Sequence, residues 1–224
     1  MTLEHDHDAH EHDAHEHGAD DEHKDHDGQA HDAHAGHDDH AGHEHVAYPD
    51  AIANYRADKD DYFRDAEGSP VPAEERATFL GIPYFPVDEA LRFEGLALEP
   101  YTGSEPAQFQ IPTSDGKLRD AVRAGTFQFE LGGVTQTLTG YSFAKGASDS
   151  VFVPFLDVTS GKESYGAGRY LDVYPEHDGT YAIDFNLAYH PSCVFDTKFS
   201  CPLTPAENRL PLRIEAGERL APEG

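Results

Sequence analysis

The sequence predicts a mainly β fold, an antiparallel β-barrel or sandwich with one or two N-terminal helices, preceded by a disordered tail. All 13 phenylalanines and 11 tyrosines lie after Val46, so the apolar surface needed for a core belongs to residues 47–224. Within that part, short stretches of alternating apolar and polar residues recur between glycines and prolines. Residues 1–46 hold too few apolar side chains to offset the entropy of an ordered chain. We therefore predict a disordered tail, 1–46, and a single β-rich domain, 47–224.

Helices are expected at the start of the domain. Between Ala51 and Ala66, the residues Ile52, Tyr55, Tyr62 and Ala66 form an apolar stripe at helical spacing, which predicts an amphipathic helix. Pro72 followed by two glutamates predicts a second short helix that ends at Gly81.

Strands follow the helices. Apolar and polar residues alternate from Leu91 to Leu98, and the alternation reverses at Gly95, which indicates a β-bulge. Residues 127–131 and 134–139 alternate on either side of two glycines, which is typical of a hairpin with a two-residue turn.

Three further strands are predicted. Residues 151–156 are apolar on both faces and indicate a buried strand, with Pro154 at a bulge or an edge. Residues 169–174 and 180–188 predict a second hairpin, in which Tyr174 pairs with Thr180. A last strand is expected over residues 210–214. Short strands in this number, with little helix, favour the barrel or sandwich.

The tail has the composition of a metal-binding segment. It contains fourteen of the sixteen histidines, interleaved with aspartate and glutamate. Four His-x-His pairs stand out, at His5/His7, His10/His12, His15/His17 and His43/His45. Alternate side chains of an extended chain point the same way, so each pair can present two imidazoles to one Zn, Ni or Cu ion. The alternatives are a solubilising tail that meets metal only incidentally and a cloning tag.

Charge is distributed over both regions. Residues 1–50 carry a net charge of −15 and the remainder carries −12. An acidic, lysine-poor surface favours a halophilic protein, because molar salt reduces the Debye length to about 3 Å and screens self-repulsion. An ordinary acidic protein is the alternative. The chain has no basic patch, so nucleic acid is not an expected partner.

Neither secretion nor membrane insertion is predicted. The N-terminus lacks the basic and apolar regions of a signal peptide. No stretch approaches 18 consecutive apolar residues. We expect a cytoplasmic protein without a membrane partner.

The predicted hairpin over 169–188 carries the densest group of polar residues. In the expected register, Tyr170 lies opposite Asp184, and Asp172 and Asn186 share their face, beside Arg169. Carboxylates, an amide and a phenol on one patch could bind a polar ligand or act as an acid/base pair. The alternative is the solvated face of a half-buried sheet.

The two cysteines lie close in sequence. A disulfide between Cys193 and Cys201 would close the long loop between them. A zinc site is the second possibility, formed by these cysteines and His190, with Asp184 or His177 as a fourth ligand. Free buried thiols are the third, and a cytoplasmic setting favours them.

Several C-terminal motifs resemble one known family. They are Phe152-Val153-Pro154-Phe155, Tyr165-Gly166-Ala167-Gly168-Arg169-Tyr170-Leu171-Asp172, Asp184-Phe185-Asn186-Leu187-Ala188-Tyr189 and Cys201-Pro202-Leu203 with Pro205-Ala206-Glu207-Asn208-Arg209-Leu210. Together they are similar to the prokaryotic domain of unknown function 1684. The likeness spans roughly residues 51–218 and implies no activity. The family usually has Asn where this chain has His190, and the tail lies outside it.

Two hypotheses for function follow. The first is a non-enzymatic module that binds a small ligand and whose tail collects divalent metal. The second is a hydrolase-type enzyme that uses Asp172, Asp184, Tyr170 and Arg169 in a pocket. The common catalytic and phosphate-binding motifs are absent from the sequence, which favours the module.

Overall fold

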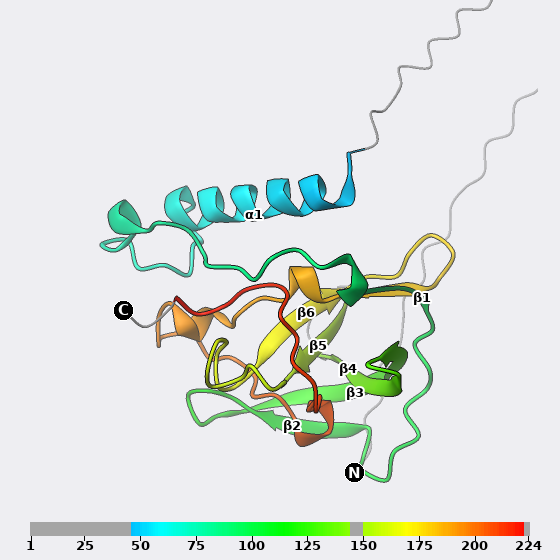
Figure 1. Ribbon diagram of the computed structural model, residues 1–224. Coiled ribbons are helices and arrows are strands. Elements are labelled where there is room, and N and C mark those ends of the chain that lie inside the picture. The colour runs from blue at the N-terminus through cyan, green and yellow to red at the C-terminus, as the bar shows by residue number, and fades with distance from the viewer. Residues whose placement is uncertain (1–45, 144–149, 222–224) are drawn as a thin grey trace, which may run out of the picture. The chain divides into compact units, whose positions relative to one another are not determined.

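The computed structural model describes residues 46–143 and 150–221. This part of the chain is mainly antiparallel β-sheet with one N-terminal α-helix, α1, which spans Tyr48–Asp65 and lies along one side of the domain (Figure 1). A proline in its first turn suits a helix start, because its missing N–H would be unpaired there in any case. None of the helices in these ranges is long and apolar enough to cross a membrane.

The inward face of α1 is more polar than its sequence predicts. Only Ile52 and Phe63 are buried, whereas Tyr55 and Tyr62 of the predicted apolar stripe are 41% and 50% exposed. Arg56 donates a hydrogen bond to the carbonyl oxygen of Phe85 instead. The helix is therefore held partly by hydrogen bonds and ion pairs, which periodicity of apolar residues does not reveal.

The predicted second helix is a single turn. Only η1, Arg76–Thr78, forms between Pro72 and Gly81. A helix of this length is marginal without tertiary support. The segment instead bends back, and Arg76 Nε donates to the carbonyl oxygen of Val71.

The strands form two antiparallel sheets. The larger has the order β2-β3-β4-β5-β6 and the smaller pairs β1 with β7. Their bounds are β1 Arg92–Leu96, β2 Gln108–Pro112, β3 Leu118–Leu131, β4 Val134–Ser142, β5 Val151–Phe155, β6 Arg169–Val173 and β7 Tyr181–Asp184. Short 3-10 turns complete the described chain: η2 Glu89–Leu91, η3 Phe185–Leu187, η4 Ser192–Val194 and η5 Ala206–Asn208.

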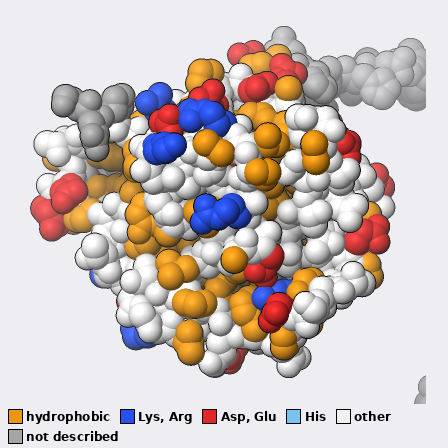
Figure 2. Space-filling view, turned by 60° about the horizontal axis from the view of Figure 1, so that its bottom comes forward, with side chains coloured by type: hydrophobic (Ala, Val, Ile, Leu, Met, Phe, Trp, Pro, Cys, Tyr) orange, Lys and Arg blue, Asp and Glu red, His pale blue; other side chains and the backbone are white. Residues whose placement is uncertain are grey.

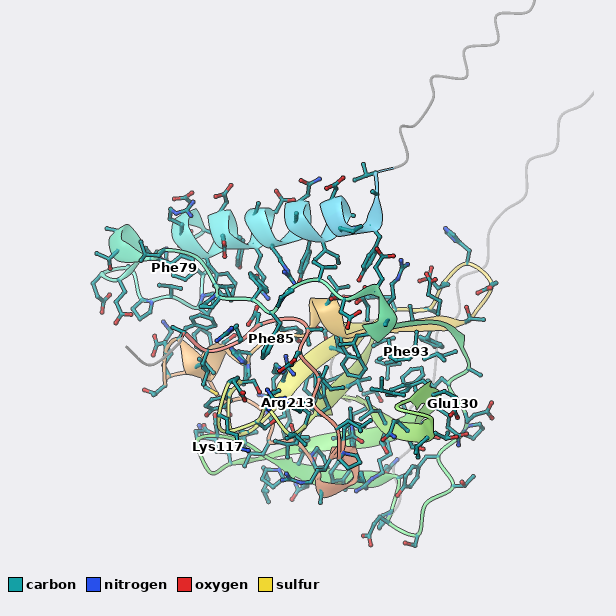
Figure 3. The ribbon with its side chains drawn as sticks, viewed as in Figure 1. Phe79, Phe85, Phe93, Lys117, Glu130 and Arg213 are labelled. Carbon is teal, nitrogen blue, oxygen red and sulfur yellow. The ribbon has the colours of Figure 1, made fainter. Side chains whose placement is uncertain are left out.

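Both sheets contribute to one core. Phe127, Phe155 and Ile183 come from β3, β5 and β7 and are fully buried in the same cluster. Phe93 of β1, labelled in Figure 3, lies with its ring centroid 4.6 Å from that of Phe129. Hydrophobic side chains left on the face in Figure 2 form several small groups rather than one continuous patch.

Two turn predictions are confirmed. Leu131 and Val134 pair across Gly132 and Gly133, whose φ angles of 66° and 73° are left-handed, as a twisted two-residue hairpin requires. The ladder between β1 and β7 shifts register between Phe93 and Leu96, at the predicted bulge.

Two strand predictions are wrong in part or whole. β5 is buried as expected but lies inside the larger sheet, not at an edge; Pro154 is tolerated because β4 pairs with β5 only at Phe152. No strand forms over residues 210–214. That segment runs beside Leu156 and Val158 through single backbone hydrogen bonds, so it never forms a ladder.

Candidate functional site

Strands β6 and β7 do not pair with each other. β6 pairs with β5, and β7 pairs with β1, so that Asp184 lies opposite Arg92 and not opposite Tyr170. The predicted register of this hairpin is therefore wrong. Only Pro175 and Tyr181 form an isolated bridge near its turn. Beyond that bridge the two strands diverge, and the second edge of β6 is bonded instead at Tyr170, which exchanges two backbone hydrogen bonds with Tyr189.

A cleft of about 310 Å³ lies between the diverging strands. It is lined by residues that include Asp172, Asp184, Leu171, Leu187, Tyr55 and Tyr189. A second cleft of about 350 Å³ adjoins it, shares Tyr55, Asp172 and Tyr189, and adds Lys59, Phe63 and His190. Since both run beside α1, we call the two together the α1 groove.

Asp172 is the accessible carboxylate of the groove. It is exposed, and Tyr189 Oη donates a hydrogen bond of 2.6 Å to its Oδ2. Burial of the Tyr189 phenol and the nearby Asp172 charge raise the pKa of Tyr189 above its usual range. Tyr189 therefore stays a neutral donor that orients Asp172.

Asp184 and Asn186 are buried and tie α1 to the domain. Tyr48 Oη donates a 2.6 Å hydrogen bond to Asp184 Oδ2, and the Asn186 backbone N–H donates to Oδ1 at 2.9 Å. The Asn186 amide exchanges two hydrogen bonds with the backbone of Asp88. Desolvation, followed by the hydrogen bond to Asp184, raises the pKa of Tyr48 above its usual range. Both predicted site residues therefore tie parts of the domain together, and Asp184 also lines the groove.

We expect Asp184→Ala to lower the free energy of unfolding by about 1–3 kcal/mol, because the Tyr48 hydroxyl and the Asn186 N–H lose their acceptor in a buried place. The matched change Asp172→Ala, on the exposed carboxylate, should alter it by no more than about 0.5 kcal/mol. Urea unfolding of both variants measures the contrast, and equal losses would contradict it.

Arg169 and Tyr170 do not face the groove. The Arg169 side chain is fully buried, and its Nη2 donates to the carbonyl oxygen of Ile214 at 2.8 Å and lies 3.4 Å from Asp157 Oδ1. Tyr170 Oη donates to the carbonyl oxygen of Pro202. The structure thus brings Asp172 and Asp184 to one cleft and leaves these two outside it.

The sequence did not predict a buried cluster of charged and polar side chains. Lys59, on α1, has its Nζ 2.7 Å from Oε1 of Glu218, which lies more than 150 residues later in the chain. Glu218 Oε2 accepts the backbone N–H of His190 at 2.7 Å, and His190 Nε2 accepts that of Tyr165 at 3.2 Å. Burial lowers the pKa of His190 to about 3 and raises that of Glu218. No local pattern signals residues brought together from so far apart.

The two cysteines are free thiols that lie close together. The Cys193 backbone N–H donates to Cys201 Sγ at 3.4 Å, and Cys193 Sγ lies 4.0 Å from Tyr165 Oη. Burial raises the pKa of the Cys201 thiol to about 11. Oxidation of the pair to a disulfide stays a prediction.

The predicted zinc set is not assembled. Within residues 46–143 and 150–221, no three His, Cys, Asp or Glu side chains are grouped so that they could hold a metal ion. His190, Cys193 and Cys201 therefore do not form such a group with Asp184 or His177. The eight histidines of the His-x-His pairs, His5 to His45, lie outside the described residues.

Comparison with known proteins gives a family without an assigned function. The model of a family described as protein of unknown function (DUF1684) matches residues 77–219. Among solved structures, the solution NMR structure of an uncharacterized protein of Haloarcula marismortui is 36% identical, with a TM-score of 0.59. The match covers 78% of this chain and 95% of that one. No curated protein matches the chain.

Proposed function

The chain belongs to the DUF1684 family of proteins of unknown function, and we propose that its folded part is a non-enzymatic module that binds a small polar ligand in the α1 groove. The observation that carries the proposal is the pair of adjoining clefts that share Asp172 and Tyr189. Small-molecule sites in proteins are concave, of about 300–1,000 Å³, largely apolar, with a few placed polar groups. The groove has these properties.

The composition of the groove supports binding over hydrolysis. Its polar groups already have fixed roles: Tyr189 orients Asp172, and Glu218 holds Lys59. The hydrolase alternative needs Arg169 beside the two carboxylates, but that guanidinium is enclosed by backbone carbonyls and Asp157. An acid/base pair of Asp172 and Asp184 would also lack a free second carboxylate, because Tyr48 and Asn186 occupy Asp184.

The test is to find what the groove binds. Full-length protein purified from its own host would be analysed by native mass spectrometry, and isotope-labelled protein would be titrated with host extract while its amide signals are followed. We expect shifts at Asp172, Tyr189 and Lys59. Asp172→Asn should remove them, whereas the exposed β3 change Asp120→Asn should not. Extract that perturbs no groove residue would refute the proposal.

We also propose that the histidine-rich tail binds divalent metal, with the four His-x-His pairs as the supporting observation. The test compares the wild-type protein with a variant of the same length. In the variant, serine replaces His5, His7, His10, His12, His15, His17, His43 and His45. The wild type should bind several Zn or Ni ions at neutral pH and lose them below about pH 6, as the imidazoles protonate. Calorimetry that gives both proteins the same stoichiometry would contradict this.

A further inference from the structure

We propose that the cleft between β6 and β7 recognises the ammonium group of a small organic cation, with Asp172 as its counter-ion. The inference rests on the proposed function, since it names the class of ligand that this part of the α1 groove would take. It depends on the charge of the cleft, on its aromatic lining and on a second site in the same protein that holds an ammonium group.

Asp184 lies 3.9 Å from Arg92 Nε, whereas Asp172 has no ion-pair partner among the described residues. The lining of the cleft includes the carboxylates of Asp172 and Asp184 and no lysine, arginine or histidine. Tyr189 is the hydrogen-bond partner of Asp172 among the described residues, and it uses only Oδ2. Asp172 Oδ1 is left for a ligand. An anionic ligand would be repelled by the Asp172 carboxylate, so a cation is favoured.

The rest of the lining suits an organic cation better than a metal ion. Tyr55, Tyr174 and Tyr189 contribute aromatic rings, and Leu171 and Leu187 contribute aliphatic surface. A metal ion requires several oxygen, nitrogen or sulfur ligands, and the described residues contain no group of three such side chains. Aromatic faces attract alkylated ammonium groups through the ring quadrupole, and the aliphatic surface can cover carbon atoms.

The protein already holds one ammonium group in this way. Lys59 Nζ lies 2.7 Å from Glu218 Oε1, 4.9 Å from the ring centroid of Tyr189 and 5.4 Å from that of Phe63. A carboxylate and two aromatic rings therefore surround the lysine head group. The cleft offers the same combination, Asp172 with the rings of Tyr189 and its neighbours. Tyr189 belongs to both sites.

The experiment compares a cation with its neutral isostere. Full-length isotope-labelled protein would be titrated at constant KCl with choline and with 3,3-dimethylbutan-1-ol, in which carbon replaces the charged nitrogen. We expect choline to shift the amide signals of Asp172, Tyr174 and Tyr189 and to bind at least about tenfold more tightly than the alcohol, a difference of about 1.4 kcal/mol. Asp172→Asn keeps an oxygen that Tyr189 can bond, and it should weaken choline about tenfold without changing the alcohol.

The controls separate this inference from the proposed function. Asp120→Asn, far from the cleft in sequence and exposed on β3, should leave choline binding unchanged. Equal binding of choline and the alcohol, or equal choline binding by wild type and Asp172→Asn, would overturn the ammonium assignment. In either case, shifts at the groove with host extract would still support the module. Absence of groove shifts with both choline and host extract would overturn both proposals.

Discussion

Asp157→Ala is expected to lower the free energy of unfolding by about 3–5 kcal/mol, because it leaves the buried Arg169 cation without its carboxylate. Asp157 is 4% exposed and also accepts the backbone N–H of Ile214 at 2.8 Å and the hydroxyl of Thr159 at 2.8 Å. Burial lowers the pKa of Arg169, while the Asp157 charge opposes that shift. The change therefore removes both a charge partner and two hydrogen-bond acceptors.

Urea unfolding of the full-length chain measures this loss against a matched control. Asp120 is exposed on β3, and among the described residues its carboxylate accepts one side-chain hydrogen bond, from Gln110 Nε2 at 3.1 Å. Asp120→Ala should therefore change the free energy of unfolding by no more than about 0.5 kcal/mol. A loss below about 1 kcal/mol for Asp157→Ala would mean that Arg169 does not depend on this carboxylate.

Local sequence patterns predicted the positions of the strands better than they predicted which strands pair with each other. The Gly132-Gly133 turn fixes its own partner, because two residues join the strands it connects. The longer turn between β6 and β7 does not, and alternation of apolar and polar residues is satisfied by any neighbour on the same face. β7 pairs with β1, whose Arg92 lies 92 residues before its partner Asp184. Nothing in the 169–188 segment specifies that pairing.

The candidate site was predicted in part for the same reason. Asp172 and Asp184 do line one cleft, although the register used to place them together is wrong. The cleft exists because β6 and β7 separate, which the hairpin prediction excluded. Lys59 and Glu218 were missed because they meet only when α1 and the end of the chain lie against the same core. The spacing of apolar and polar residues along the sequence does not predict long-range contacts of this kind.

Acidification should reveal His190 as a residue that is buried in the neutral form. It is 5% exposed, and burial, with the charges of Arg169 and Lys59, lowers its pKa to about 3. In the unfolded chain the pKa is about 6.5. Above pH 6.5 the imidazole is neutral in both the folded and the unfolded state, and its contribution to stability is fully present. As the pH falls from 6.5 toward 3, only the unfolded state takes up the proton, so stability is lost by up to about 1.4 kcal/mol per pH unit.

A variant without the imidazole isolates this contribution. Glu218, which faces His190, has a raised pKa and so takes up its proton in the folded state first, which opposes the loss on acidification. His190→Asn keeps the backbone N–H that Glu218 accepts, so the Glu218 contribution is retained in both proteins. Between pH 6.5 and 4.5 we expect the variant to gain about 2.5 kcal/mol relative to the wild type. Urea unfolding at several pH values measures the difference. Parallel pH profiles for the two proteins would show that the His190 imidazole protonates in the folded protein as readily as in the unfolded one.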